Sequence, residues 1–276
     1  MSTAPRVAVV LGGGGAKAAA HLGAAIALRE AGITPVHWIG TSMGSVVAAA
    51  MAGGADPAGM LAEFGQIRAS EVLKRERFAL LKGIWAPAIF QSEVFRVMLE
   101  RLIVPRSFAE LVTPCSITAV ERDTGKTVVF GSNGEDAPLI DVLAASCALP
   151  PWFHPVTVNG RALYDGGIRA PLPLPQAEDI DCDIVLAIDV GPGFDEIGET
   201  VLKPPPFVAA ADTAIGWLMA GTTQLLRERW DRDRSLPRLV YVRPTSDRGA
   251  TFAIDRIGHY GEVGAGKVRA IIRELQ

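Results

Sequence analysis

The sequence contains few cysteines, little excess charge and no cluster of basic residues. Its three cysteines have no CxxC spacing, which excludes a zinc ribbon and a disulfide framework and favours a reducing compartment, so we expect a cytoplasmic protein. The formal net charge of −3 gives no electrostatic reason to bind nucleic acid. Histidines, cysteines and acidic residues show no metal-ligand spacing, and we expect neither a metal ion nor another cofactor.

Long apolar stretches are scarce as well. The apolar segment before the first glycine run is too short for the core of a signal peptide, so we expect the mature chain to begin where the sequence does. Residues 207–226 could be mistaken for a membrane span, but Asp212 would be costly at the centre of a membrane. This segment is therefore predicted to form a buried or partly interfacial helix, either a plain core helix or a lipid-contacting surface.

Apolar residues are abundant, at 49% of the 276 positions, which is enough to bury a large core. Strand patterns at 6–12 and 36–42 are each followed by a helix pattern, at 16–31 and 43–52. This strand–helix alternation is typical of a parallel sheet with helices packed on it.

Later segments follow a different pattern. Two hairpins are predicted, at 116–132 and 156–167, and a buried strand at 183–191. Ser92 is predicted to cap a helix and Pro138 to open another. The whole order predicts one α/β domain with a largely parallel central sheet.

Four consecutive glycines at 12–15 follow the first strand and precede Lys17, an arrangement typical of loops that bind negative charge. That charge is either the phosphate of a nucleotide or the oxyanion formed when an ester is attacked. The pattern GxGxxA from Gly13 to Ala18 makes a nucleotide-binding α/β protein one hypothesis. Against it, the second strand ends near Ile39 without the acidic residue that a dinucleotide site needs, and the GK[ST] core of a phosphate loop is missing.

The stretch GTSMG, from Gly40 to Gly44, lies between a predicted strand and a predicted helix. This is the context of a nucleophile elbow, because a sharp turn lifts the hydroxyl of Ser42 out of the sheet and the glycines avoid clashes there. Ser42 is therefore a candidate nucleophile, with an idle glycine-flanked turn as the plain alternative.

A serine hydroxyl needs a base to take its proton. A triad of Ser42, Asp189 and His259 has the chain order of an α/β-hydrolase, but such an elbow normally follows several strands, and Ser42 follows only the second. The two histidines within the first 40 residues are interpreted as structural. Asp165 is the remaining candidate, since it ends a predicted strand, although a DGG sequence by itself is usually a turn.

Four stretches, taken in order, point to a known family: LGGGGAKAAAHLG, GTSMGS, AASCALPPWFHPV followed by LYDGGIRAPLPL, and HYGEVGAGK. Over nearly all its length the chain resembles the patatin-like phospholipases, particularly the bacterial branch related to the neuropathy-target-esterase catalytic domain. The resemblance implies a three-layer α/β/α patatin-like fold with a largely parallel central sheet, and a single acyl hydrolase domain over residues 1–276.

The resemblance also implies a Ser–Asp dyad, with Ser42 as nucleophile and Asp165 as base. The oxyanion hole then falls on the glycine loop, with a basic residue beside it: Gly13, Gly14, Gly15 and Lys17. The elbow and the turn after the aspartate are completed by Gly40, Met43, Gly44, Gly166 and Gly167. Two departures concern loop geometry and substrate preference: Ala18 stands where the family commonly has glycine, and residues 168–171 replace its usual Asn-Pro or Asn-Leu-Pro.

An aspartate of ordinary pKa is a weak base for serine, so we expect burial to raise the pKa of Asp165, with Trp152, Phe153 and Tyr164 as apolar walls. The implied substrate is a lysophospholipid, a phospholipid or another acyl ester, and the implied membrane contact is peripheral. The apolar stretch 78–90 is interpreted as an acyl pocket or lid, or as core. A catalytically silent lipid-binding module is the third hypothesis.

Overall fold

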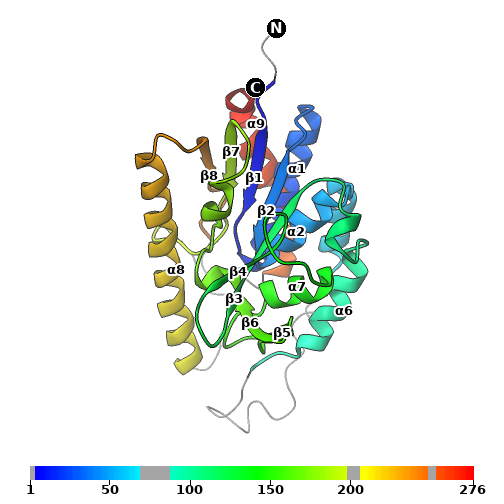
Figure 1. Ribbon diagram of the computed structural model, residues 1–276, viewed down its shortest axis with the longest axis vertical. Coiled ribbons are helices and arrows are strands. Elements are labelled where there is room, and N and C mark those ends of the chain that lie inside the picture. The colour runs from blue at the N-terminus through cyan, green and yellow to red at the C-terminus, as the bar shows by residue number, and fades with distance from the viewer. Residues whose placement is uncertain (1–3, 69–87, 198–205, 248–252) are drawn as a thin grey trace.

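An eight-stranded mixed sheet forms the middle layer of the computed structural model, which describes residues 4–68, 88–197, 206–247 and 253–276 (Figure 1). The strands are β1 (Val7–Leu11), β2 (His37–Thr41), β3 (Cys115–Glu121), β4 (Thr127–Gly131), β5 (Val156–Val158), β6 (Arg161–Asp165), β7 (Ile184–Ile188) and β8 (Arg238–Val242). They are ordered β5-β6-β3-β2-β1-β7-β8, and β4 pairs with β3. The strands from β3 through β2, β1 and β7 to β8 are parallel, and β4, β5 and β6 add antiparallel pairs.

Helices cover both faces of this sheet. The α-helices of the described ranges are α1 (Ala19–Glu30), α2 (Met43–Ala52), α3 (Pro57–Gly65), α6 (Ser92–Leu102), α7 (Leu139–Ser146), α8 (Pro206–Arg232) and α9 (Ile257–Ile271). Short 3₁₀ turns occur at η1 (Gly15–Ala18), η3 (Phe108–Glu110), η4 (Gly166–Ile168), η5 (Leu174–Ala177), η7 (Ile254–Arg256) and η8 (Ile272–Leu275).

The alternation of side chains along β1 shows the three layers. Val9 and Leu11 face the larger core, which they share with α1, α2 and α9, whereas Ala8 and Val10 face a smaller core closed by Trp230 of α8. In Figure 1, α8 stands on one side of the sheet and α1 and α2 on the other. The predicted three-layer α/β/α fold with a largely parallel sheet is confirmed.

Local signals explain most element ends. Gly32 follows α1 with a φ of 70°, and Asn159 and Gly160 take φ values of 49° and 76° in the turn of the predicted second hairpin. The prediction for Ser92 was wrong: it is the first residue of α6, Gln91 occupies the cap position, and the Ser92 hydroxyl has no partner within the described residues. Strand β8 was not predicted.

Helix α8 differs from a core helix. It is longer than the predicted segment, and its buried side chains are only Met219, Ala220, Thr223 and Trp230 among the described residues. No helix in the described ranges is both long enough and apolar enough to cross a membrane. The interpretation of this segment as a plain core helix is therefore wrong.

The glycine run at residues 12–15 follows β1, the strand at which the order of the sheet reverses. The chain proceeds from β1 to β2 and β3 on one side, and later returns to place β7 on the other side of β1. In open α/β sheets this reversal creates a crevice at the carboxyl ends of the strands. The loop after β1 opens into that crevice.

Candidate active site

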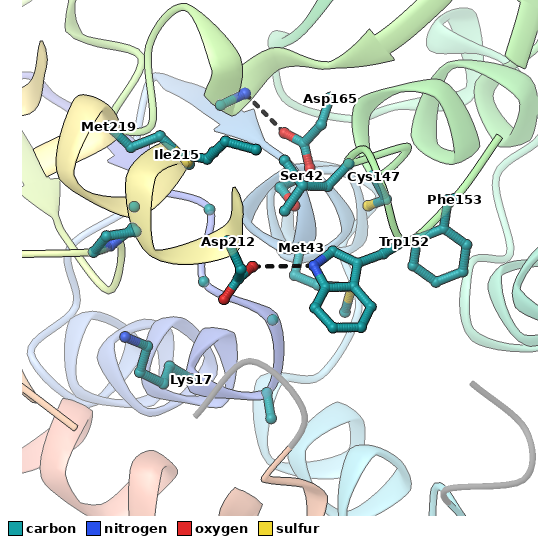
Figure 2. A pocket seen from close by; sticks show the side chains of 18 of the residues that line it. Lys17, Ser42, Met43, Cys147, Trp152, Phe153, Asp165, Asp212, Ile215 and Met219 are labelled. Atoms are coloured by element: carbon teal, nitrogen blue, oxygen red, sulfur yellow. Dashed lines mark hydrogen bonds between the residues drawn. The ribbon is translucent and has the colours of Figure 1, made fainter. Parts of the chain in front are cut away.

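The sheet itself brings Ser42 and Asp165 together. Strand β2 runs parallel to β3 and ends with Thr41 opposite Thr118, whereas β6 runs antiparallel and ends with Asp165 opposite Ala119. Both β2 and β6 pair with β3, and they run in opposite directions. Their carboxyl ends therefore lie at neighbouring positions of β3. Ser42, the residue after β2, therefore lies beside Asp165 (Figure 2).

Ser42 occupies a strained turn at the start of α2. Its φ of 52° and ψ of −137° lie in a region that residues other than glycine rarely adopt. Ser45 stabilises the turn, because its N–H and its hydroxyl both donate to the Ser42 carbonyl oxygen, at 2.8 and 2.6 Å. A methyl group on Gly44 would overlap the carbonyl oxygen of Leu11, so the elbow packs directly on the end of β1.

Asp165 is a buried carboxylate at the end of β6. Asp165 is 2% exposed, the Gly167 N–H donates to Oδ1 at 2.7 Å, and Ser42 lies beside the carboxylate (Figure 2). Burial raises the pKa of Asp165 to about 7, although Ser42 and the Gly167 N–H favour the charged form. Burial thus makes this aspartate more basic than an ordinary aspartate.

The end of α7 holds both members of this pair, a role that was not predicted. The Ser146 hydroxyl accepts from the Ser42 N–H at 2.9 Å and donates to the Thr118 carbonyl at 2.8 Å, and the Ala148 carbonyl accepts from the Asp165 N–H at 3.2 Å. Between them lies Cys147, and burial raises the pKa of its thiol, so the thiol is neutral. The stretch AASCALPP was recognised in the sequence as part of a family motif, but no role was predicted for Ser146.

The glycine loop is held by the N–H groups of Gly12 and Gly13, which donate to carbonyls of other segments, and it presents two unused N–H groups. The Gly13 N–H donates to the Pro171 carbonyl at 2.9 Å, so this N–H already has an acceptor. The N–H groups of Gly14 and Gly15 have no acceptor among the described residues. A methyl group on Gly14 would overlap the Val190 carbonyl oxygen, so this part of the loop admits no side chain.

Lys17 lines the same pocket but is directed elsewhere. It is 3% exposed, and its Nζ lies 3.4 Å from Oε1 of Glu196 and 3.3 Å from the Asp247 carbonyl oxygen. Burial lowers the pKa of Lys17, and the Glu196 carboxylate opposes that shift. In Figure 2 Lys17 lies apart from Ser42.

The histidines and Asp189 do not form a triad with Ser42. Asp189 accepts hydrogen bonds from the Tyr241 hydroxyl at 2.6 Å and from Arg243 at 3.2 Å, and His259 is exposed on α9. His21 is fully buried with its Nε2 2.8 Å from the Gly12 carbonyl oxygen, and burial lowers its pKa to about 4, so it supports the loop as a neutral ring.

A pocket of about 250 Å³ opens beside Ser42 and Asp165. Its apolar lining comes from several elements: Met43, Phe64, Ile67, Phe95, Met98, Leu149, Trp152, Phe153, Ile215, Trp217, Met219, Ile254 and Ile257. Trp152 and Phe153 are thus pocket walls, as predicted, and Tyr164 is not among the lining residues. Most of the stretch 78–90 lies outside the described residues, but Phe90 stacks on Trp152 with ring centroids 5.6 Å apart.

Helix α8 lines another side of the pocket. The Trp152 indole N–H donates to Oδ1 of Asp212 at 3.1 Å, which links α8 to the segment after α7 (Figure 2). Burial raises the pKa of Asp212, and this hydrogen bond opposes the shift. Within the described residues no three metal-ligating side chains are grouped.

Comparison with known proteins adds to this geometry. The model of the family described as patatin-like phospholipase matches residues 9–178. An uncharacterized NTE family protein of Mycobacterium tuberculosis is 36% identical over 190 residues, which cover 68% of this chain and 50% of the relative. The lysophospholipase nte1 of Emericella nidulans is 25% identical over 299 residues, which cover 98% of this chain and 18% of that protein.

Among solved structures, VipD from Legionella pneumophila aligns with a TM-score of 0.52 at 14% identity, covering 99% of this chain and 67% of VipD, which shows a shared fold. The chain spans about half the length of the mycobacterial relative. The family match confirms the resemblance that the four sequence stretches indicated.

Proposed function

We propose, from the premise that this chain belongs to the patatin-like phospholipase family, that it is a serine acyl hydrolase that cleaves carboxylic ester bonds of lipids. One observation carries the proposal: Ser42, on a strained elbow, lies beside Asp165, whose burial raises its pKa to about 7. A base with a pKa near the working pH combines a useful ionised fraction with real basicity. The proposed unit is one domain over residues 1–276.

In the first half of the reaction, the Ser42 hydroxyl attacks the ester carbonyl while Asp165 takes its proton. The carbonyl oxygen gains negative charge and is bound by the N–H groups of Gly14 and Gly15, which have no other acceptor among the described residues. Each such donor contributes about 2.7–4 kcal/mol in the transition state. When the tetrahedral intermediate collapses, the C–O bond breaks and Asp165 protonates the departing alcohol.

In the second half, a water molecule attacks the acyl-enzyme. Asp165, ionised again, takes a proton from the water, and the same two N–H groups bind the new oxyanion. The Ser42–acyl bond then breaks, the serine oxygen recovers the proton from Asp165, and the carboxylic acid leaves. The dyad returns to its starting state without a metal or a third residue.

The pocket favours a long acyl chain over a nucleotide. Its walls are aromatic and aliphatic near Ser42, with Phe95, Met98 and Phe153 on one side and Met219 on the other. Apolar walls around a reacting ester suit a fatty acyl group. We therefore place a lysophospholipid or phospholipid in the substrate class, with peripheral contact to membranes during its capture.

The test is a panel of p-nitrophenyl esters and lysophospholipids, applied to the wild type and to Ser42→Ala and Asp165→Asn. We expect turnover in the wild type, loss in both variants and a preference for longer acyl chains. Ser116→Ala is the matched control, because Ser116 is also buried and hydrogen bonded but contacts His37 and Ser132. Folded wild-type protein that hydrolyses none of the esters would instead support a silent lipid-binding module.

A further inference from the structure

The outer face of α8 is apolar over most of its length. Phe207, Trp217, Leu218 and Leu225 are 74%, 64%, 72% and 66% exposed. Leu218 follows Phe207 by three helical turns and Leu225 follows Leu218 by two, so these side chains share one face. In Figure 1, α8 forms the margin of the molecule, and no labelled element lies outside it.

Between Phe207 and Leu226 this outer face carries no charge, and the charged residues of α8 follow from Arg227 onward. The only ionisable residue between Phe207 and Leu226 is Asp212, and its carboxylate turns inward to the Trp152 indole (Figure 2). Helices that face water normally present charged side chains on that side. A helix face that is neutral over several turns favours an apolar or interfacial neighbour over water.

The hydroxyls of Thr213 and Thr222 on α8 are satisfied by the helix itself. The Thr213 hydroxyl donates to the Ala209 carbonyl at 2.8 Å, and the Thr222 hydroxyl donates to the Leu218 carbonyl at 2.9 Å. These i−4 bonds leave neither hydroxyl dependent on water for a hydrogen-bond acceptor. The face can therefore lose its water at a small polar penalty.

The same helix joins this face to the pocket of Ser42. Trp217 is exposed and also lines the pocket, and Met219, on the opposite side of α8, lines it as well. Ile168, on the turn η4 after Asp165 and next to α8, is 36% exposed. Apolar surface thus continues from the outside of the molecule to the dyad.

We infer that the outer face of α8 docks on the surface of a lipid bilayer, lying along it and not crossing it. The inference rests on the proposed function, because a lipid substrate would then pass from the bilayer past Trp217 into the pocket. A protein bound over Trp217 would cover that path, which favours a lipid surface over a second copy of this chain. The neutral face makes apolar burial the driving force, so docking needs no anionic lipid.

The experiment is flotation of the protein with neutral phosphatidylcholine vesicles. It uses the Ser42→Ala protein, so that hydrolysis cannot alter the vesicles, and compares it with the same protein carrying Leu218→Gln and Leu225→Gln. We expect the double change to lower vesicle partitioning about tenfold or more, since two apolar side chains leave the lipid. The matched control, Val104→Gln with Val112→Gln, removes two exposed apolar side chains outside α8 and leaves partitioning unchanged.

Two further measurements distinguish a failure of the proposed hydrolase function from a failure of bilayer docking. In the active protein, Leu218→Gln with Leu225→Gln should leave hydrolysis of the short ester p-nitrophenyl butyrate unchanged, because neither leucine lines the pocket. If the wild type does not hydrolyse the short ester, the proposed function is contradicted, whereas the measured vesicle binding still stands. The inference is overturned if the protein does not bind vesicles, or if the double variant binds them equally well. It is also overturned if light scattering shows a dimer that the double change converts to monomers.

Discussion

The two walls of the pocket are built in different ways. The wall that carries Ser42 is held by main-chain hydrogen bonds and buried hydroxyls. The Ser146 hydroxyl accepts from the Ser42 N–H, and the Pro171 carbonyl accepts from the Gly13 N–H. The opposite wall, α8, is largely exposed and is tied to the segment after α7 by the side chains of Asp212 and Trp152. The difference indicates that the proposed reacting atoms are fixed by backbone geometry, whereas the position of α8, the proposed substrate-contacting wall, depends on fewer contacts.

Asp165→Asn should produce the largest effect on the first wall. An amide keeps the shape of the carboxylate but cannot take the Ser42 proton, so we expect kcat to fall about 10²- to 10⁴-fold. In the wild type, kcat/KM should rise with pH through about 7 as Asp165 ionises, and then level off. The measurement is a pH–rate profile with p-nitrophenyl butyrate for both proteins.

Thermal stability gives an independent control on the same residue. The pKa of Asp165 is raised from 3.8 to about 7 in the folded chain, so between these values the folded state holds a proton that the unfolded state has lost. This contribution to stability is present at low pH and is lost as the pH rises to about 7. Asp165→Asn should therefore gain stability relative to the wild type over that range, and parallel Tm curves would contradict the assignment.

The same substitution on the two walls compares them directly. A methyl group on Gly14 would overlap the Val190 carbonyl, whereas one on Gly221 of α8 meets open space. Gly14→Ala should lower kcat about 10²- to 10³-fold by displacing an oxyanion donor. Gly221→Ala should leave kcat unchanged and raise the free energy of unfolding by about 0.5–1 kcal/mol, since alanine suits a helix better. Similar losses of kcat in both variants would break the comparison.

Ser146→Ala should have a smaller effect, because it removes a support and no reacting atom. With the Ser42 N–H left without its buried acceptor, we expect kcat to fall about five- to tenfold while KM for a short ester stays constant. Ser116→Ala, at a buried serine outside the site, is the control for general destabilisation. If both variants lose the same activity, Ser146 has no specific positioning role.

Asp212→Asn should have the smallest effect. An amide oxygen can still accept the Trp152 indole N–H, so the link between α8 and the segment after α7 persists. We expect kcat/KM for p-nitrophenyl butyrate to change by less than about threefold. A loss as large as that of Ser146→Ala would place α8 among the rigid parts of the site.

Much of this arrangement was predictable from local sequence signals. The strand–glycine–helix pattern at Gly12 to Gly15 and the GTSMG elbow are short motifs, and each indicates one element of the site by itself. The turn at Asn159 and Gly160 locates the hairpin that ends at Asp165. These signals work because glycine and turn residues report backbone geometry directly.

The remainder depends on contacts between distant segments. The use of the Gly13 N–H by Pro171 could not be read from the glycine run, because the acceptor arrives from the other side of the sheet. The role of Ser146 required the register of β2, β3 and β6. The exposure of α8 was not settled by its composition, because an apolar helix can face a core or a lipid surface equally well.

Covalent labelling with a fluorophosphonate tests the central claim most directly. An activated serine oxygen displaces fluoride from the phosphorus of this reagent, and mass spectrometry of the digested protein locates the adduct. The account predicts one adduct, on Ser42, that disappears in Ser42→Ala and forms far more slowly in Asp165→Asn. Folded wild-type protein that stays unlabelled, or an adduct on another serine, would contradict it.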